Sequence, residues 1–228
     1  GSGPEGASPD LPRALRPVGF AWILGAALAL PLIHYTTWSW PVLWPKDATY
    51  RLLHAAGILL GWSLVEFVVP GRPWVLRPAC RALAVFGALF ILLEPYEGVL
   101  GWAKVVGGGA AGAVLAVLCA ELTRRAQVRH HPAAAMACLF LSAAGGVGVL
   151  FLGKTATAAQ ASAGLAALAA ATGVASILTR RSTPTMAGAF VLSGLLAWLL
   201  AVGCFGTGQT NLASSVLLLL SPLGMALP

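Results

Sequence analysis

The chain has 228 residues, of which 58% are hydrophobic and only 9% are charged, whereas about 25% of a typical soluble domain is charged. So few charged side chains cannot cover the surface of a soluble protein of this size. A disordered chain would combine low hydrophobicity with a high net charge. The composition therefore predicts an all-α fold, a polytopic bundle of transmembrane helices. The net charge of +7 fits basic loops on the cytoplasmic side of a membrane, so we expect no nucleic-acid partner.

Apolar runs divide the chain into candidate spans, because a helix needs about 20 mostly apolar residues to cross roughly 30 Å of hydrocarbon. Residues 17–228 are expected to form a single transmembrane helical domain, and the Gly- and Pro-rich residues 1–16 a disordered linker. The last run has no basic anchor, so it is short or re-entrant, or the natural chain continues. The prediction is seven spans plus one doubtful C-terminal span. The candidates are 17–37, 50–70, 79–96, 99–122, 133–153, 157–178, 185–206 and 210–227.

Basic residues alternate between the two sides of these predicted crossings. Cytoplasmic loops are enriched in Lys and Arg, so the alternation predicts a cytoplasmic N-terminus, and we expect a bacterial-type inner membrane. The predicted cytoplasmic side carries Arg13, Arg16, Arg72, Arg77, Arg81, Arg124, Arg125, Arg129, Arg180 and Arg181, and the outer side carries Lys46, Arg51, Lys104 and Lys154.

Small residues recur at spacings that let helices pack closely. Helices in lipid gain little from burying apolar surface, and close backbone approach through small residues is a main source of association. Gly57 and Gly61 form one GxxxG pair, and Gly108 and Gly112 form another. We expect these glycines to pack against helices of the same chain, or, as the alternative, against other subunits.

Polar residues gather at the predicted outer ends of the spans. They form either an outward-facing vestibule for a small polar ligand or ion, or a set of ion pairs that close short loops. His54 shares a helix face with Gly61, so it is expected to face a neighbouring helix. The candidate polar pocket comprises His34, Asp47, His54, Glu94, Glu97, Lys104 and Lys154.

Glu66 is the candidate intramembrane acid, because it is the deepest acid of the predicted spans. Ionisable residues within a bilayer are costly and are functional candidates by default. The alternatives are an interfacial carboxylate paired with a loop arginine such as Arg72, or a proton relay. Glu121 is expected to pair with Arg124 and Arg125 at the surface.

One catalytic pattern matches in letters only. Residues 148–155 satisfy GxxxxGK(S/T), but a phosphate loop follows a strand, and here the residues between the glycines are apolar and end a span. No Asp follows Asp47, so nothing could supply the Mg²⁺-binding Asp. The cysteines are far apart and form no zinc spacing. We therefore expect no nucleotide, no cofactor, no metal and no catalytic residue.

These features favour a non-catalytic multi-pass membrane protein that acts as a scaffold or accessory subunit of a membrane assembly. Its partners would be the lipid bilayer and either other membrane subunits or further copies of the chain. The first alternative is a small-solute or ion transporter or channel that uses the outer vestibule. A weaker alternative is an intramembrane enzyme acting on a lipid-borne substrate through Glu94, Glu97 and the histidines.

Overall fold

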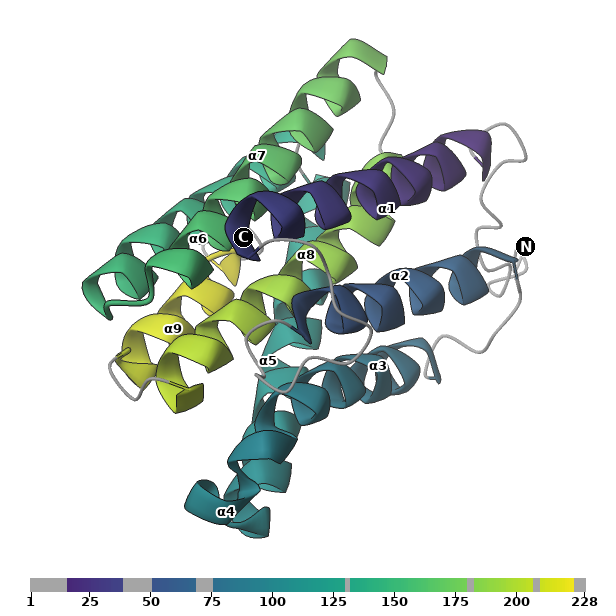
Figure 1. Cartoon of the computed structure of the whole chain (residues 1–228). Coiled ribbons are helices and arrows are strands. Elements are labelled where there is room, and N and C mark those ends of the chain that lie inside the picture. Colours follow the sequence, from purple (N-terminus) through teal and green to yellow (C-terminus); the bar gives the residue numbers. More distant parts are fainter. Residues whose placement is uncertain are drawn as a thin grey trace.

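The computed structural model describes residues 16–38, 51–68, 76–129, 132–179, 183–206 and 210–223, and within these ranges every regular element is a helix (Figure 1). The all-helical fold class is thus confirmed. In chain order the elements are α1 (Arg16–Trp38), α2 (Leu52–Val68), α3 (Leu76–Leu93), the 3₁₀ helix η3 (Glu94–Tyr96), α4 (Glu97–Leu100), α5 (Trp102–Arg129), α6 (Pro132–Leu152), α7 (Ala156–Thr179), α8 (Thr183–Ala201), the π-helix η4 (Val202–Gly206) and α9 (Leu212–Leu220).

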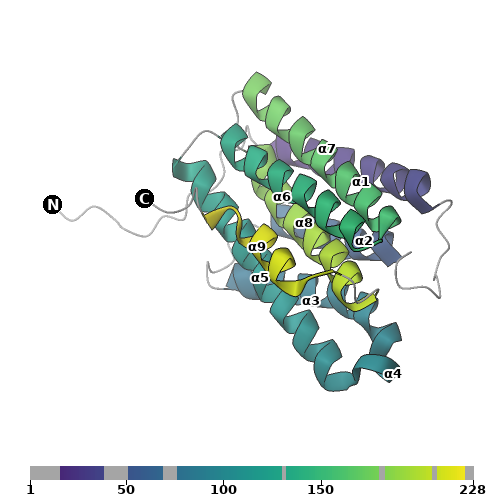
Figure 2. The same ribbon diagram turned by 90° about the vertical axis from the view of Figure 1, so that its left-hand side faces the viewer.

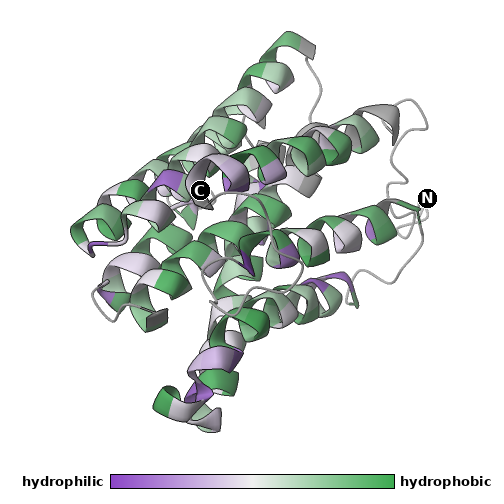
Figure 3. Cartoon of the chain, in the orientation of Figure 1, coloured by the Kyte–Doolittle hydropathy of each residue, from purple (hydrophilic) through white to green (hydrophobic). Residues whose placement is uncertain are grey.

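Six helical segments of the described residues are long and apolar enough to cross a membrane. In the view of Figure 3 hydrophobic residues predominate along these helices, as expected for helices that contact both lipid and one another. The fold is that of a multi-pass integral membrane protein. The six segments are Phe20–Thr37, Leu76–Leu100, Trp102–Ala126, Ala133–Leu152, Ala156–Leu178 and Gly188–Phe205.

Two predicted spans are shorter than the rest. α2 has 17 residues and is apolar, which gives it a length of about 25 Å. α9 has 9 residues, or about 13 Å, less than half of the hydrocarbon thickness. The doubtful eighth span is therefore a short helix in the described part of the chain, which packs against α5, α6 and α8.

α8 is the central helix of the bundle, and Figures 1 and 2 show it enclosed by the other helices. It packs against α1, α2, α3, α5, α6, α7 and α9. Every residue from Ala189 to Leu200 is buried, including Trp198, which is fully enclosed. Ser193 is the one polar residue in this run with a side-chain hydroxyl, and it donates a hydrogen bond to Sγ of Cys119 at 3.3 Å. The middle of the bundle is thus an apolar column.

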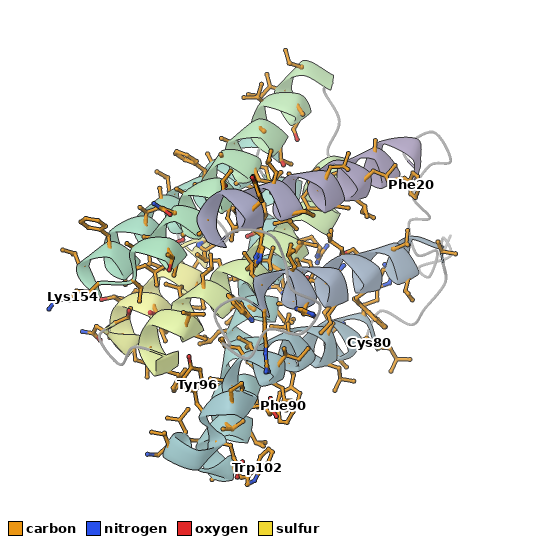
Figure 4. All side chains as sticks on the ribbon, in the orientation of Figure 1. Phe20, Cys80, Phe90, Tyr96, Trp102 and Lys154 are labelled. Carbon is orange, nitrogen blue, oxygen red and sulfur yellow. The ribbon has the colours of Figure 1, made fainter. Side chains whose placement is uncertain are left out.

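The hairpin of α3 and α5 extends beyond the other helices and carries α4 at its tip (Figures 1 and 2). Gly101 turns the chain between α4 and α5 with a φ of 77°, a conformation that favours glycine. The rings of Phe90 and Trp102 stack with centroids 6.1 Å apart across this tip (Figure 4). Trp102 is half-exposed, and tryptophan is enriched in the headgroup layer of membranes.

Candidate functional site

Two ends of the bundle can be distinguished by their charges. α3 and α5 form an antiparallel hairpin, so the start of α3 and the end of α5 share one end. This arginine end carries the described residues Arg77, Arg81, Arg124 and Arg125. The opposite end holds the start of α2, η3 and the turn between α6 and α7, and most of the predicted polar pocket belongs to it.

His34 of α1 and His54 of α2 both lie towards this opposite end, on helices that pack along each other. His34 is 1% exposed and His54 is half-buried. His34 lies near the end of α1 and His54 near the start of α2, and the two helices run antiparallel (Figure 1).

Arg51, directly before α2, joins the same end to α3. Its Nη1 donates hydrogen bonds to the carbonyl oxygen of Ile91 at 2.9 Å and to Oε2 of Glu94 at 3.0 Å. Arg51 is 5% exposed, whereas the Glu94 side chain is half-exposed. The guanidinium thus both caps the C-terminal carbonyls of α3 and neutralises an acid of η3. Sequence reasoning placed Arg51 among the polar residues at the outer ends of the spans and did not predict its contacts with Ile91 and Glu94.

Three further members of the predicted pocket do not join this group. Glu97 begins α4 at the tip of the α3–α5 hairpin, and Lys104 is exposed on the first turn of α5. Lys154 points away from the bundle at the turn between α6 and α7 (Figure 4). Among the described residues, no ion pair involves any of these three side chains. Asp47 lies outside the described residues.

At the arginine end Glu66 is bound by two side chains, Arg81 of α3 and Trp62 of its own helix. Arg81 of α3 donates to both carboxylate oxygens, from Nε at 3.0 and 3.1 Å and from Nη2 at 2.8 Å. Trp62 donates from Nε1 to Oε1 at 3.0 Å, one turn before Glu66 on α2. The Arg81 guanidinium lies 5.5 Å from the ring centroid of Phe190 on α8, a cation–π contact. This bidentate geometry engages both oxygens of the Glu66 carboxylate.

The structure pairs Glu66 with Arg81, and Arg72, the loop arginine given as an example from the sequence, lies outside the described residues. Sequence reasoning counted Arg81 among the loop charges. The signal that could have found it is position: Glu66 lies near the end of α2 and Arg81 near the start of α3, and antiparallel neighbours bring such residues to one level. The side chains of this pair are 17% and 19% exposed, so much of it is removed from water.

Glu121 and its neighbours form a local cluster on the last turns of α5. Nε of Arg124 donates to Oε2 of Glu121 at 2.8 Å, and Nη2 donates to Oε1 at 2.6 Å. Arg125 lies 3.5 Å from the same carboxylate. All three side chains are at least one-third exposed. This is a surface ion-pair network within one helix.

The run that matches the phosphate-loop formula forms the C-terminal end of a helix. α6 continues through Leu152, and the amides of Lys154 and Thr155 donate to the carbonyl oxygens of Phe151 and Leu150, both at 2.9 Å. The second of these bonds spans five residues, as in a Schellman motif, and Lys154 takes the left-handed conformation with a φ of 56°. The backbone amides thus close the helix end rather than surround an anion.

The two GxxxG pairs have different surroundings within the chain. A Cβ on Gly112 would lie 2.6 Å from Cδ1 of Leu89, and one on Gly108 would lie 3.3 Å from the ring of Phe205. A Cβ on Gly57 or Gly61 would meet no atom within 4 Å, and both residues are exposed. The α5 pair thus lets α3 and η4 approach closely, and the α2 pair faces outward.

The small residues of α6 lie against two neighbouring helices, α9 and α7. A Cβ on Gly145 would lie 2.5 Å from Cδ2 of Leu218 on α9, and the hydroxyl groups of Ser142 and Ser221 are in hydrogen-bond contact on the same side. Towards α7, Ser162 donates to the carbonyl oxygen of Ala143 at 2.8 Å, an interhelical hydrogen bond. Small side chains and hydroxyl bonds are the means by which helices associate in lipid.

The described residues contain no group of three His, Cys, Asp or Glu side chains that could hold a metal ion. The four cysteines are free thiols. In comparisons with known proteins, no family model matches the chain, and no curated protein or solved structure matches it. The geometry of the two ends and of the apolar column is thus the basis for any functional assignment.

Proposed function

We propose that the chain is a non-catalytic scaffold or accessory subunit of a membrane assembly. The observation that carries this proposal is the apolar column around α8. From Ala189 to Leu200 the helix is buried among apolar side chains contributed by seven other helices. A path for ions or polar solutes would need polar or ionisable groups near the middle of the bundle.

The buried hydroxyl groups support the same reading, because most of them bond within their own helix. Thr123 donates to the carbonyl oxygen of Cys119 at 2.8 Å, and Ser176 donates to that of Thr172 at 2.9 Å. Ser63 donates to Leu59 in the same way at 2.9 Å. Hydroxyl groups satisfied by the preceding turn are not available to coordinate a solute.

The orientation belongs to the same proposal. The arginine end would face the cytoplasm, which places the N-terminus inside, and the membrane would be a bacterial-type inner membrane. Labelling of single cysteines with an impermeant maleimide in intact cells tests this orientation. Cysteine in place of exposed Arg125 should be protected, and cysteine in place of exposed Lys154 should react. The reverse pattern would invert the topology.

The main experiment measures complex formation and transport activity in parallel. The chain is extracted into native nanodiscs and weighed by native mass spectrometry, and it is also reconstituted into liposomes for flux measurements with H⁺, K⁺ and Cl⁻ probes. The proposal expects a fixed-stoichiometry complex, with itself or with another membrane subunit, and flux equal to that of protein-free liposomes. A lone monomer, or flux above the control, would contradict it.

A second candidate, a small-solute or ion transporter, is favoured by the polar group at the end opposite the arginines. His34, His54 and the Arg51–Glu94 pair place ionisable side chains against three helices there. This candidate expects His54→Ala and Glu66→Gln to abolish uptake in liposomes while the helical content stays unchanged. Glu97→Gln, at the exposed hairpin tip, is the matched control.

A further inference from the structure

The start of α3 carries more positive charge than the acids of α2 and α3 neutralise. Arg77 and Arg81 lie on the first two turns of α3, and Glu66 is the one acidic residue within the bounds of the two helices. Glu66 is engaged by Arg81. In the described part of the chain Arg77 is exposed and takes part in no ion pair or hydrogen bond. One full positive charge is therefore left at the start of α3.

The guanidinium of Arg81 has donors left for a second partner. Glu66 binds its Nε and Nη2, and the ring centroid of Phe190 lies 5.5 Å from its central carbon. The third nitrogen, Nη1, donates no hydrogen bond within the described residues, and the side chain is 19% exposed. A guanidinium that is already fixed in place loses little conformational entropy when it binds a further acceptor.

Arg77 and Arg81 are placed to bind one ligand together. Residues four apart lie on the same face of a helix, with their Cβ atoms about 5–6 Å apart. An anion with several oxygen atoms can accept from Nη1 of Arg81 and from the Arg77 guanidinium at once. We propose that Arg77 and Arg81 bind the phosphate of an anionic phospholipid in the leaflet at the arginine end.

The position of the two arginines along the span favours a lipid headgroup over a free anion. The apolar segment Leu76–Leu100 begins directly before Arg77, so both arginines lie at the boundary of the hydrocarbon, where lipid phosphates are found. Leu76 and Leu83 of the same helix are 51% and 69% exposed and offer apolar surface to acyl chains. The excess positive charge favours an anionic headgroup over a zwitterionic one.

The arginines at the end of α5 provide a matched control. Glu121 lies 2.6 Å from Arg124 and 3.5 Å from Arg125, so its carboxylate contacts both. The last turns of a helix also favour a cation, whereas the first turn, where Arg77 lies, favours an anion. Arg125 is exposed like Arg77, and replacing either one changes the net charge equally. An effect specific to Arg77 therefore separates this site from a general attraction of the arginine end.

The first test titrates the full chain in detergent with dioleoylphosphatidylglycerol and, separately, with dioleoylphosphatidylcholine. Native mass spectrometry gives the dissociation constant of the first bound lipid, and circular dichroism checks that each variant is folded. We expect the phosphatidylglycerol to bind more tightly, and Arg77→Gln to weaken its binding about fivefold. Arg77→Lys should lose less, and Arg125→Gln should weaken binding less than about twofold. Equal losses in Arg77→Gln and Arg125→Gln, or equal affinities of the native chain for the two lipids, would overturn the proposal.

The second test locates the lipid and separates it from a free anion. Phosphatidylglycerol with a photoactivatable headgroup is cross-linked to the native chain in nanodiscs, and the labelled peptides are identified by mass spectrometry. We expect labelling to concentrate at the start of α3, to fall in Arg77→Gln, and to persist in an excess of inorganic phosphate. Labelling spread equally over the start of α3 and the end of α5, or displacement of the lipid by inorganic phosphate, would refute the assignment.

Discussion

α2 and α5 carry the same two sequence features and use them differently. Each has a GxxxG pair and a glutamate near its arginine end. On α5 the glycines lie against Leu89 and Phe205, and Glu121 pairs with arginines of its own helix. On α2 the glycines face outward, and Glu66 pairs across to α3. A GxxxG pair or a glutamate in the sequence thus shows only that a helix can make a close contact or an ion pair. Which residue it contacts depends on the helix that packs beside it.

The largest effect is expected from breaking the Glu66–Arg81 pair. Arg81→Ala leaves a carboxylate that is 17% exposed without its counter-charge and removes the contact with Phe190. Fully buried pairs cost about 3–5 kcal/mol when one partner is removed, so this partly exposed pair should cost about 2–3 kcal/mol. The measurement is the melting midpoint in detergent, which should fall by about 4–12 °C. Arg77→Ala, on the exposed first turn of α3, is the control and should change it little.

The second effect tests the packed glycines of α5. In Gly112→Ala the new methyl group would lie 2.6 Å from Cδ1 of Leu89, which is itself fully buried and cannot move freely. Overpacking costs about 1–3 kcal/mol, and the better helix propensity of alanine returns up to about 1 kcal/mol. The net loss should be about 1–2 kcal/mol in the same melting experiment. A midpoint equal to that of the native chain would mean that α3 and α5 are less closely packed.

The third prediction is an increase in stability rather than a loss. Gly61→Ala places its methyl group in open space on the outer face of α2, and so does Gly57→Ala. Each should stabilise the isolated chain by about 0.5–1 kcal/mol, because glycine within a helix is unfavourable relative to alanine. Destabilisation of the monomer by either variant would show that α2 is packed inward, contrary to the structure.

The smallest effect is expected at Glu121. Arg124→Ala removes a pair in which both side chains are at least one-third exposed, and Arg125 remains beside the same carboxylate. Exposed pairs of this kind are worth about 0.2–1 kcal/mol. The melting midpoint should fall by no more than about 4 °C. A loss equal to that of Arg81→Ala would remove the distinction between the local and the interhelical pair.

The sequence was most informative where a property is summed over many residues. Helical class and membrane embedding follow from apolar runs of about 20 residues, which tolerate errors at single positions. The boundaries and lengths of single helices were predicted less well. The last span was predicted over 210–227, whereas α9 has nine residues in the described part of the chain. The helix ends at Leu220, with Ser221 as its C-cap directly before Pro222, and Leu218 of its last turn lies against Gly145 of α6, a contact that no local signal encodes.

The candidate site divides in the same way. Placing His34, His54 and Glu94 towards one side needed only the direction of each span. Which of them meet was not predictable, because contact depends on how each helix is rotated about its axis and on which helix lies beside it. The contacts of Arg51 were not predicted for this reason, although its guanidinium binds the carbonyl oxygen of Ile91 and the carboxylate of Glu94.

Composition and the order of apolar runs by themselves determined that this chain is a helical protein of the membrane, since the transfer of some 20 apolar residues into lipid outweighs any local preference. Only the tertiary structure decided that α8 occupies the centre, that Glu66 binds Arg81, and that one glycine pair is packed while the other is open. The physical reason is that an apolar helix face has nearly the same free energy against lipid as against another apolar helix. Packing, rather than hydrophobicity, therefore selects which faces meet.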